Sequence, residues 1–413
     1  MLTTNRRDFL KSSMVACGLT VPSFLSKTAN ALQVAGTPGA RDTILVVVQL
    51  TGGNDGLNTV IPFTDEEYPR LRPTLRIARD QVRRLNDTLG LHPAMEGMAG
   101  LLQDNALCVV QGVGYPNPSQ SHFRSMDIWQ AASTADTLNE GWLGKALRSM
   151  NAPAFHIAAG NESAPLAYSG APARVPSITS LDDFQLRTAG AGDADTRRQR
   201  EIITGLAQPG GTGTPNPANL LDFVQRTAQN TYQSSQRLQE IGRNYTPRVP
   251  YPQTGLANRL RLVAQLINAE LGARLFYVSI DGFDTHANQA ASHGNLLGEV
   301  SGAITAFYRD LAARGHANRL LIMTFSEFGR RARENGSRGT DHGSGAPMFL
   351  VGGRVRAGVI GEHPSLTQLD AGNLRHHTDF RQVYAAILDQ WLGVPSREVL
   401  GQAYEPVSIL ARR

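Results

Sequence analysis

Short apolar runs alternate with helical stretches along most of this 413-residue chain, and this alternation limits its possible folds more than any other feature. The first run, residues 43–50, is continuous and β-branched, which is typical of a central parallel strand covered on both faces. The pattern predicts an α/β fold, with a mostly parallel central sheet and helices on both faces. Further expected strands cover residues 106–111, 155–158, 274–280, 319–325 and 346–351. Expected helices cover residues 94–103, 123–132, 219–241, 256–271, 294–313 and 379–392.

The N-terminal segment has the features of an export signal, in the expected order. Arg6 and Arg7 form a twin-arginine motif, an apolar stretch covers residues 14–25, and residues 29–31 form a small-residue cleavage site. We therefore expect residues 1–31 to be a twin-arginine signal peptide. The twin-arginine translocation machinery is then a partner, and the mature protein lies in the periplasm or outside the cell.

Residues 32–42 are interpreted as a linker and residues 43–413 as a single α/β domain. Within it, about 160–251 is polar and rich in proline and glycine, which predicts a partly helical insertion. The mature chain contains no apolar run long enough for a membrane span. The formal charge of +5 comes from scattered arginines without interleaved aromatics. This distribution argues against nucleic-acid binding and is compatible with an anionic ester substrate.

Two acidic–histidine pairs lie beside expected strands. Asp284 and His286 follow strand 274–280, and Asp341 and His342 precede strand 346–351. Carboxylate oxygen and imidazole nitrogen are ligands of divalent metal ions, and ligands collect at the carboxyl ends of strands in open α/β sheets. The alternatives are a turn-forming aspartate beside a surface histidine for the first pair and a capped turn for the second.

Three further positions are candidates. Asp55 follows the first strand in a glycine-rich loop and is either a metal ligand or an Asx-turn residue. Glu327 follows strand 319–325 and needs a partner, which is either a metal ion or one of the arginines Arg330 and Arg331. Ser119, Ser121 and His122 precede the expected helix 123–132. The free N–H groups of that helix would bind an anion and activate a serine, unless a serine only caps the helix.

Five segments in order resemble an exported bacterial family known only as domain-of-unknown-function family 1501: residues 47–58, 118–129, 282–286, 325–330 and 339–343. More distantly, they resemble the alkaline phosphatase and sulfatase superfamily. Its members place a metal-binding aspartate after the first strand, as Asp55 is here, and a nucleophile at a helix start, as Ser121 or Ser119 is. A later strand is followed by an acidic–histidine pair, which Asp284 and His286 resemble.

The chain departs from that superfamily at one motif. Ser-Glu-Phe-Gly at residues 326–329 takes the position of the superfamily's Ser-Asp-His-Gly, so Phe328 stands where a histidine ligand is expected. Asp341 and His342 match the residue types of that motif, but they take the position of the superfamily's final histidine. The resemblance therefore implies one metal site from Asp284, His286 and His342, with Asp341 beside it. A second site, formed by Asp55, Glu327 and Ser121, lacks a nitrogen ligand.

The resemblance implies an exported hydrolase of phosphate or sulfate esters that depends on a divalent ion of zinc, manganese, magnesium or calcium. Ser121 would attack phosphorus or sulfur, and His122 or Arg124 would help to bind the oxyanion. The alternative is a non-catalytic periplasmic binding or assembly protein with a degenerate alkaline-phosphatase-like site. Phe328 is the residue that favours this alternative.

Overall fold

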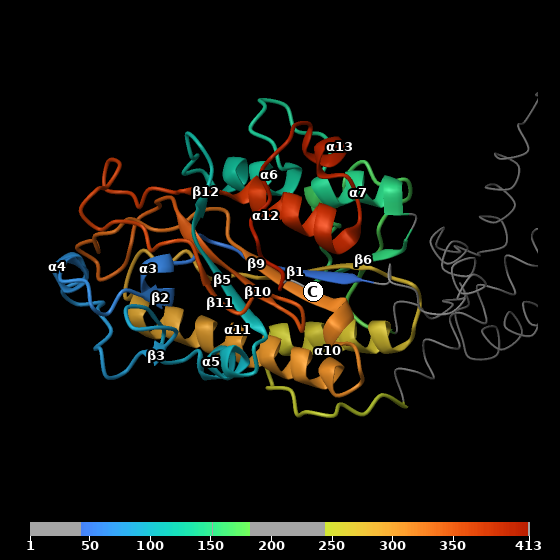
Figure 1. Cartoon of the computed structure of the whole chain (residues 1–413), viewed down its shortest axis with the longest axis horizontal. Helices are drawn as coiled ribbons and strands as arrows, with labels where there is room; N and C mark the ends of the chain where they lie inside the picture. The colour runs from blue at the N-terminus through green and yellow to red at the C-terminus, as the bar shows by residue number, and fades with distance from the viewer. Residues whose placement is uncertain (1–42, 151, 182–243, 412–413) are drawn as a thin grey trace, which may run out of the picture. The chain divides into compact units, whose positions relative to one another are not determined.

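The computed structural model describes residues 43–150, 152–181 and 244–411 (Figure 1). The chain forms two compact units, and the larger one comprises residues 37–179, 246–264 and 273–413. The expected signal peptide, the linker and helix 219–241 lie outside the described residues, and so does most of the predicted insertion. The predicted domain boundaries stay a prediction.

Within the described ranges, none of the helices is long and apolar enough to cross a membrane.

Nine described strands form the central sheet of the larger unit, in the order β11-β5-β10-β9-β1-β8-β6-β7, with β12 paired to β5. β1 pairs in parallel with β8 and β9, whereas β10 is antiparallel to both β9 and β5. The sheet is therefore mixed but mostly parallel, and the predicted fold class is confirmed. The strands are β1 (Ile44–Leu50), β5 (Leu107–Gly114), β6 (Ala154–Ile157), β7 (Ser177–Ile178), β8 (Leu275–Ile280), β9 (Leu320–Phe325), β10 (Ala346–Val351), β11 (Gly358–Ile360) and β12 (Thr378–Asp379).

The direction of β10 determines where the chemistry-bearing loops meet. β1, β5, β8 and β9 run the same way, because β10 is antiparallel to both of its neighbours. The amino end of β10 therefore lies beside the carboxyl ends of the others, as the pairing of Ala346 with Val113 shows. The segment that leads into β10 reaches the same edge of the sheet as the segments that leave β1, β5, β8 and β9.

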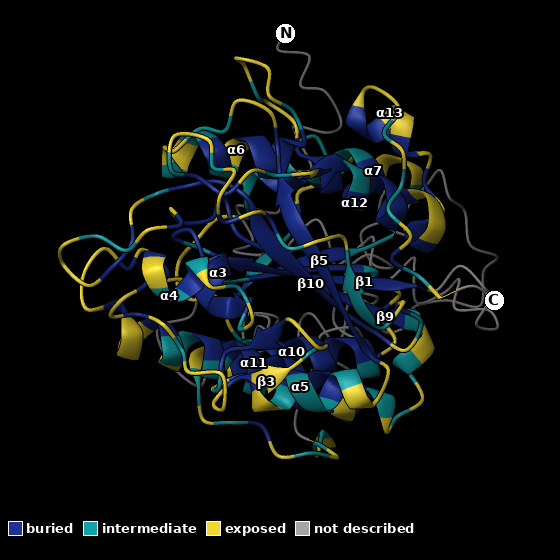
Figure 2. Ribbon diagram, turned by 60° about the vertical axis from the view of Figure 1, so that its left-hand side comes forward, coloured by how far each residue is buried: buried dark blue, intermediate teal, exposed yellow. Residues whose placement is uncertain are grey.

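Helices cover both faces of this sheet. Helices α6, α7 and α12 lie on one face, and α5 and α11 lie on the other (Figure 1). Figure 2 shows the central strands, such as β5 and β10, in dark blue between these layers, whose outward sides are teal and yellow. The main helices are α5 (Glu96–Gln103), α6 (His122–Ala131), α7 (Trp142–Met150), α10 (Gly255–Asn268), α11 (Gln289–Ala312), α12 (Phe380–Ala386) and α13 (Ser396–Leu400).

Shorter elements complete the described ranges. A small three-stranded sheet has the order β2-β4-β3. The short elements are α3 (Gly56–Thr59), β2 (Val60–Ile61), α4 (Glu67–Leu71), β3 (Arg83–Arg84), β4 (Gly90–Leu91), η1 (Leu166–Tyr168), η3 (Ala317–Arg319) and the π-helix η4 (Ile387–Leu392). Of these short elements, only η4 lies within a predicted helix, residues 379–392, and the others are too short to show a clear period. Helix α7 is also absent from the sequence prediction, although its apolar residues follow a helical period.

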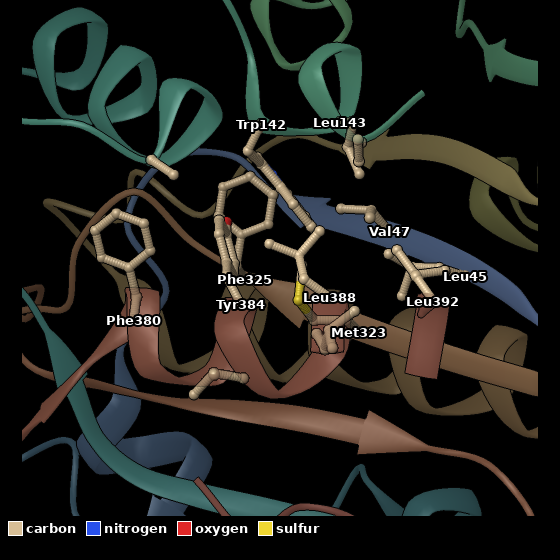
Figure 3. Close-up of a cluster of buried hydrophobic side chains, with 14 of the residues drawn as sticks. Leu45, Val47, Trp142, Leu143, Met323, Phe325, Phe380, Tyr384, Leu388 and Leu392 are labelled. Atoms are coloured by element: carbon tan, nitrogen blue, oxygen red, sulfur yellow. The ribbon is translucent and has the colours of Figure 1, made fainter. Parts of the chain in front are cut away.

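The hydrophobic core between the sheet and α7, α12 and η4 fixes this layer in place. Trp142 of α7 stacks on Tyr384 of α12 at 4.2 Å between ring centroids. Leu45 and Met323 supply apolar side chains from neighbouring strands, and both are fully buried (Figure 3). Burying such side chains stabilises the fold by roughly 1.5–3 kcal/mol each. The layer thus forms a rigid support for the loops at the edge of the sheet.

Candidate metal centre

A sharp turn after β1 brings the first of the loops against Asp284. Gly52 has a φ of 116°, in the region that favours glycine, and a Cβ at this position would lie 2.4 Å from the backbone nitrogen of Asp284. The backbone can approach this closely only because Gly52 has no side chain. The loop after β8, which carries Asp284, is therefore held against the end of the central strand.

Three imidazole groups converge on the carboxylate of Asp284. The Nε2 atom of His286 lies 2.9 Å from Oδ1, and the Nε2 atom of His342 lies 3.1 Å from the same oxygen. The Nε2 atom of His122 lies 3.4 Å from Oδ2. The structure thus brings together Asp284, His286 and His342, which the sequence analysis groups, and adds His122 from the start of α6.

The other ring nitrogen of each histidine faces a hydrogen-bond acceptor. The Nδ1 atom of His122 lies 2.8 Å from Oε1 of Glu327, and that of His342 lies 2.9 Å from the backbone oxygen of Gln120. The Nδ1 atom of His286 is 3.5 Å from Oδ1 of Asp341. An acceptor at Nδ1 keeps the proton there, so the Nε2 lone pair of the neutral ring is directed at the centre.

The donor arrangement fits a divalent ion. The Nε2 atom of His122 is shielded from solvent, and it has no hydrogen-bond partner in the part of the chain that the structure describes. The Nε2 atoms of His286 and His342 are 3.0 Å apart. Two imidazole nitrogens without protons do not bind each other, whereas two that share an ion about 2 Å away lie roughly 3 Å apart. Ligand atoms of His122, Asp284 and His342 all lie within 4.8 Å of one another.

The buried side chain of Arg330 forms an ion pair with Asp284. The Nη2 atom of Arg330 donates to Oδ1 of Asp284 at 2.6 Å, and Nε donates to the backbone oxygen of Gly53 at 2.6 Å. Partial burial raises the pKa of Asp284, but the hydrogen bond and the positive charge of Arg330 outweigh it and lower the pKa to about 2. The carboxylate is therefore charged at neutral pH. Arg330 pairs with Asp284, and not with Glu327 as the sequence analysis considers.

Glu327 lies behind His122 rather than at the centre. It is fully buried, and its Oε1 atom accepts from the backbone nitrogen of Gly52 at 2.8 Å as well as from His122. Phe328 packs its ring 4.9 Å from that of His122 and 4.8 Å from that of His342. Glu327 thus orients His122, and the ring of Phe328 packs against two of the three histidines of the cluster.

Asp55 lies outside this cluster, and its role as a metal ligand stays a prediction. The Nη2 atom of Arg72 donates to Oδ1 at 2.8 Å, while Nη1 of Arg72 and Nε2 of Gln289 donate to Oδ2. Asp55 and Arg72 both have fully buried side chains. Both carboxylate oxygens are thus occupied, and Asp55 forms a buried ion pair that the sequence does not reveal.

Asp341 and Ser121 flank the cluster without entering it. Oδ1 of Asp341 accepts from Asn335 Nδ2 at 3.1 Å and lies behind His286. Ser121 is the exposed N-cap residue of α6, and its hydroxyl makes no capping hydrogen bond in the described part of the chain. Its sequence neighbours on both sides, residues 120 and 122, contact the cluster. The choice between Ser119 and Ser121 as nucleophile stays a prediction.

Two side chains at the start of α6 have contacts that the sequence does not reveal, and their role in binding an oxyanion stays a prediction. His122 points to the ligand centre rather than serving only as an anion-binding group, and Arg124 donates to the backbone oxygens of Thr134, Ala135 and Asp136. The one sequence signal for His122 was its place in Pro-Ser-Gln-Ser-His before a helix. Its pairing with Glu327 depends on two segments that are far apart in the chain.

Residues 42–402 match the model of one protein family, whose description is "Protein of unknown function (DUF1501)". No curated protein sequence matches the chain.

The solved structures with a similar arrangement are distant. The C-terminal periplasmic domain of EcEptC from Escherichia coli, in complex with zinc, is 10% identical over 75% of this chain and 73% of that one, with a TM-score of 0.33. Alkaline phosphatase from the Antarctic bacterium TAB5 is 10% identical over 75% and 92%, with a TM-score of 0.29. PsFucS1 sulfatase from Pseudoalteromonas sp. is 12% identical over 94% and 77%, with a TM-score of 0.33. At these TM-scores the chemistry follows only from the side chains of the site itself.

Proposed function

This chain belongs to the DUF1501 family, and we propose that it is an exported, metal-dependent hydrolase of phosphate or sulfate esters. One observation carries the proposal: the Nε2 atoms of His122, His286 and His342 converge on Asp284, and each Nδ1 atom faces an acceptor. Such histidines are oriented for a divalent ion before it binds. The export step rests on residues 1–31, which lie outside the described residues.

His122, Asp284 and His342 would hold the ion, and His286 would complete the set. Mixed nitrogen and oxygen donors suit zinc or manganese better than calcium or magnesium, which favour oxygen ligands. When bound, such an ion supplies Lewis-acid stabilisation of the negative charge that develops on a transferred phosphoryl or sulfuryl group. Arg330 keeps Asp284 ionised, so the site retains an anionic ligand at neutral pH.

Ser121 is the proposed nucleophile, with Ser119 as the alternative. Ser121 precedes the ten-residue helix α6, whose unpaired N–H groups and positive dipole end favour an anionic group at this position. The serine oxygen forms a bond to phosphorus or sulfur as the bond to the ester oxygen breaks. The proton lost by the serine passes through solvent to the departing alkoxide, which leaves as the alcohol. Water then cleaves the serine ester, and free phosphate or sulfate is released with the serine restored.

The test combines metal content with ester hydrolysis. Protein purified without chelator should contain about one zinc or manganese ion per chain. Asp284→Ala and His342→Ala should lose the ion. Ser121→Ala should keep it but lose the hydrolysis of p-nitrophenyl phosphate and p-nitrophenyl sulfate. His316→Ala is the matched control, since His316 lies before β9, at the opposite end of that strand from the cluster. Wild-type protein that takes up no metal on titration contradicts the proposal.

A second candidate is a periplasmic binding or assembly protein that keeps the ion but performs no chemistry. Two observations favour it: Asp55 is paired with Arg72, and Phe328, which stands where the resemblance implies a histidine, packs against His122. Metal bound by the wild type, without hydrolysis of either ester type at any metal loading, supports this candidate. Hydrolysis that Ser121→Ala abolishes rejects it.

A further inference from the structure

One buried amide joins three segments that are far apart in the sequence. Gln289, the first residue of α11, is fully buried, and its Nε2 atom donates to Oδ2 of Asp55. Its Oε1 atom accepts from Oγ1 of Thr285 at 3.0 Å and from Oγ1 of Thr340 at 2.6 Å. A single side chain thus links the loop after β1, the loop after β8 and the segment before β10.

The chemistry of the partners leaves this amide one orientation. The Arg72 guanidinium holds Asp55 in its charged form, and a charged carboxylate only accepts hydrogen bonds, so it must face the NH₂ group of Gln289. Threonine hydroxyls donate to the remaining oxygen. The three hydrogen bonds are therefore mutually consistent, and a rotated amide would turn its oxygen toward the Asp55 carboxylate, which has no proton to donate.

The two threonines are adjacent to the candidate ligands. Thr285 lies between Asp284 and His286, and Thr340 immediately precedes Asp341 and His342. The backbone nitrogen of Thr340 also donates to the backbone oxygen of Thr285 at 3.1 Å. A shift of the Gln289 amide would therefore change the separation of the two ligand-bearing segments.

Asp55, the carboxylate that binds the Gln289 amide, is itself fixed by Arg72. Arg72 binds Asp55 through two nitrogens, and its Nε atom donates to the backbone oxygen of Ala332 at 2.7 Å. Gln289 itself begins a helix of 24 residues, and its backbone nitrogen donates to the oxygen of Arg338 at 2.9 Å.

We propose that Gln289 is a positioning residue, which sets the spacing of Asp284 and His286 relative to His342 for binding of the ion. This inference rests on the proposed metal site.

The experiment measures cobalt binding, because the visible absorption of Co²⁺ reports coordination geometry without any need for activity. Gln289→Leu removes the amide at similar volume. We expect it to weaken Co²⁺ binding by roughly 10- to 100-fold, as the loss of groups that orient metal ligands does, and to change the absorption spectrum. Thr340→Val removes only one donor to Gln289, so it keeps the inference testable if Gln289→Leu fails to fold. It should produce a smaller change of the same kind.

Asn58→Leu is the matched control. Asn58 is a buried amide that donates to the oxygen of Leu75 at 2.7 Å and accepts from the hydroxyl of Tyr68 at 3.0 Å, so it contacts neither ligand segment. This variant should lower the melting temperature and leave the affinity and spectrum of Co²⁺ unchanged. Wild-type affinity and spectrum in both Gln289→Leu and Thr340→Val overturn the inference and leave the proposed function standing. A wild type that binds no Co²⁺ overturns both.

Discussion

At the residue scale, the buried ion pair of Asp55 and Arg72 has a measurable dependence on pH. Burial raises the pKa of Asp55, but the charge and hydrogen bonds of Arg72 outweigh it and lower the pKa to about 2. A pKa below that of the unfolded chain means that the pair stabilises the fold above about pH 4, and that this contribution falls as the pH drops toward 2. The contribution at neutral pH is about 2 kcal/mol. Asp55→Asn combined with Arg72→Met should remove this pH-dependent component from urea unfolding curves.

Single substitution of Arg72 should be more harmful than the double substitution. Arg72→Met leaves the buried charge of Asp55 without its partner, which costs about 3–5 kcal/mol of the free energy of unfolding. The exposed pair of Arg70 and Glu67 provides the control, because Arg70→Met should change that free energy by less than about 1 kcal/mol. Equal effects of the Arg70 and Arg72 substitutions would contradict the importance assigned to burial.

The sequence predicts which residues meet at the site better than it predicts their individual partners. Asp284 and His286 follow a strand, and the carboxyl ends of parallel strands share one edge of a sheet, so their place at that edge follows from the pattern. His342 precedes its strand, and only the resemblance to a known superfamily groups it with them. The pairing of Asp55 with Arg72 does not follow, since it depends on how the loop after α4 turns back. For the same reason, the sequence does not reveal that Glu327 faces His122.

At the element scale, the aromatic side chain of Trp129 packs α6 against the sheet and α12. Trp129 stacks on Phe380 at 4.3 Å and on Phe325 at 5.5 Å between centroids. Trp129→Ala should lower the free energy of unfolding by about 3–5 kcal/mol through loss of this packing. Trp129→Phe should cost less, because Nε1 of Trp129 has no hydrogen-bond partner in the described ranges to lose. Chemical denaturation distinguishes the two, and equal losses would contradict this account of α6.

The direction of β10 is the part of the element arrangement that the sequence did not predict. Its six residues are all buried, and a strand covered on both faces has the same apolar pattern in either direction. Only the pairing with β5 and β9 shows that its amino end reaches the site. This is why Asp341 and His342, which precede a strand, join Asp284 and His286, which follow one.

At the scale of the whole molecule, the candidate ligands come from three separate segments of the chain, so only the folded protein assembles them. An ion that binds the folded state alone stabilises it by about 2.7 kcal/mol when its free concentration is 100 times the dissociation constant. For a chain of this size the melting temperature should rise by roughly 3 °C. Scanning calorimetry after removal of metal with a chelator, and again after addition of zinc, measures this change. Asp284→Ala should melt at the same temperature in both conditions, because it lacks the carboxylate on which the histidines converge. A rise in Asp284→Ala as large as in the wild type would place the ion elsewhere in the molecule.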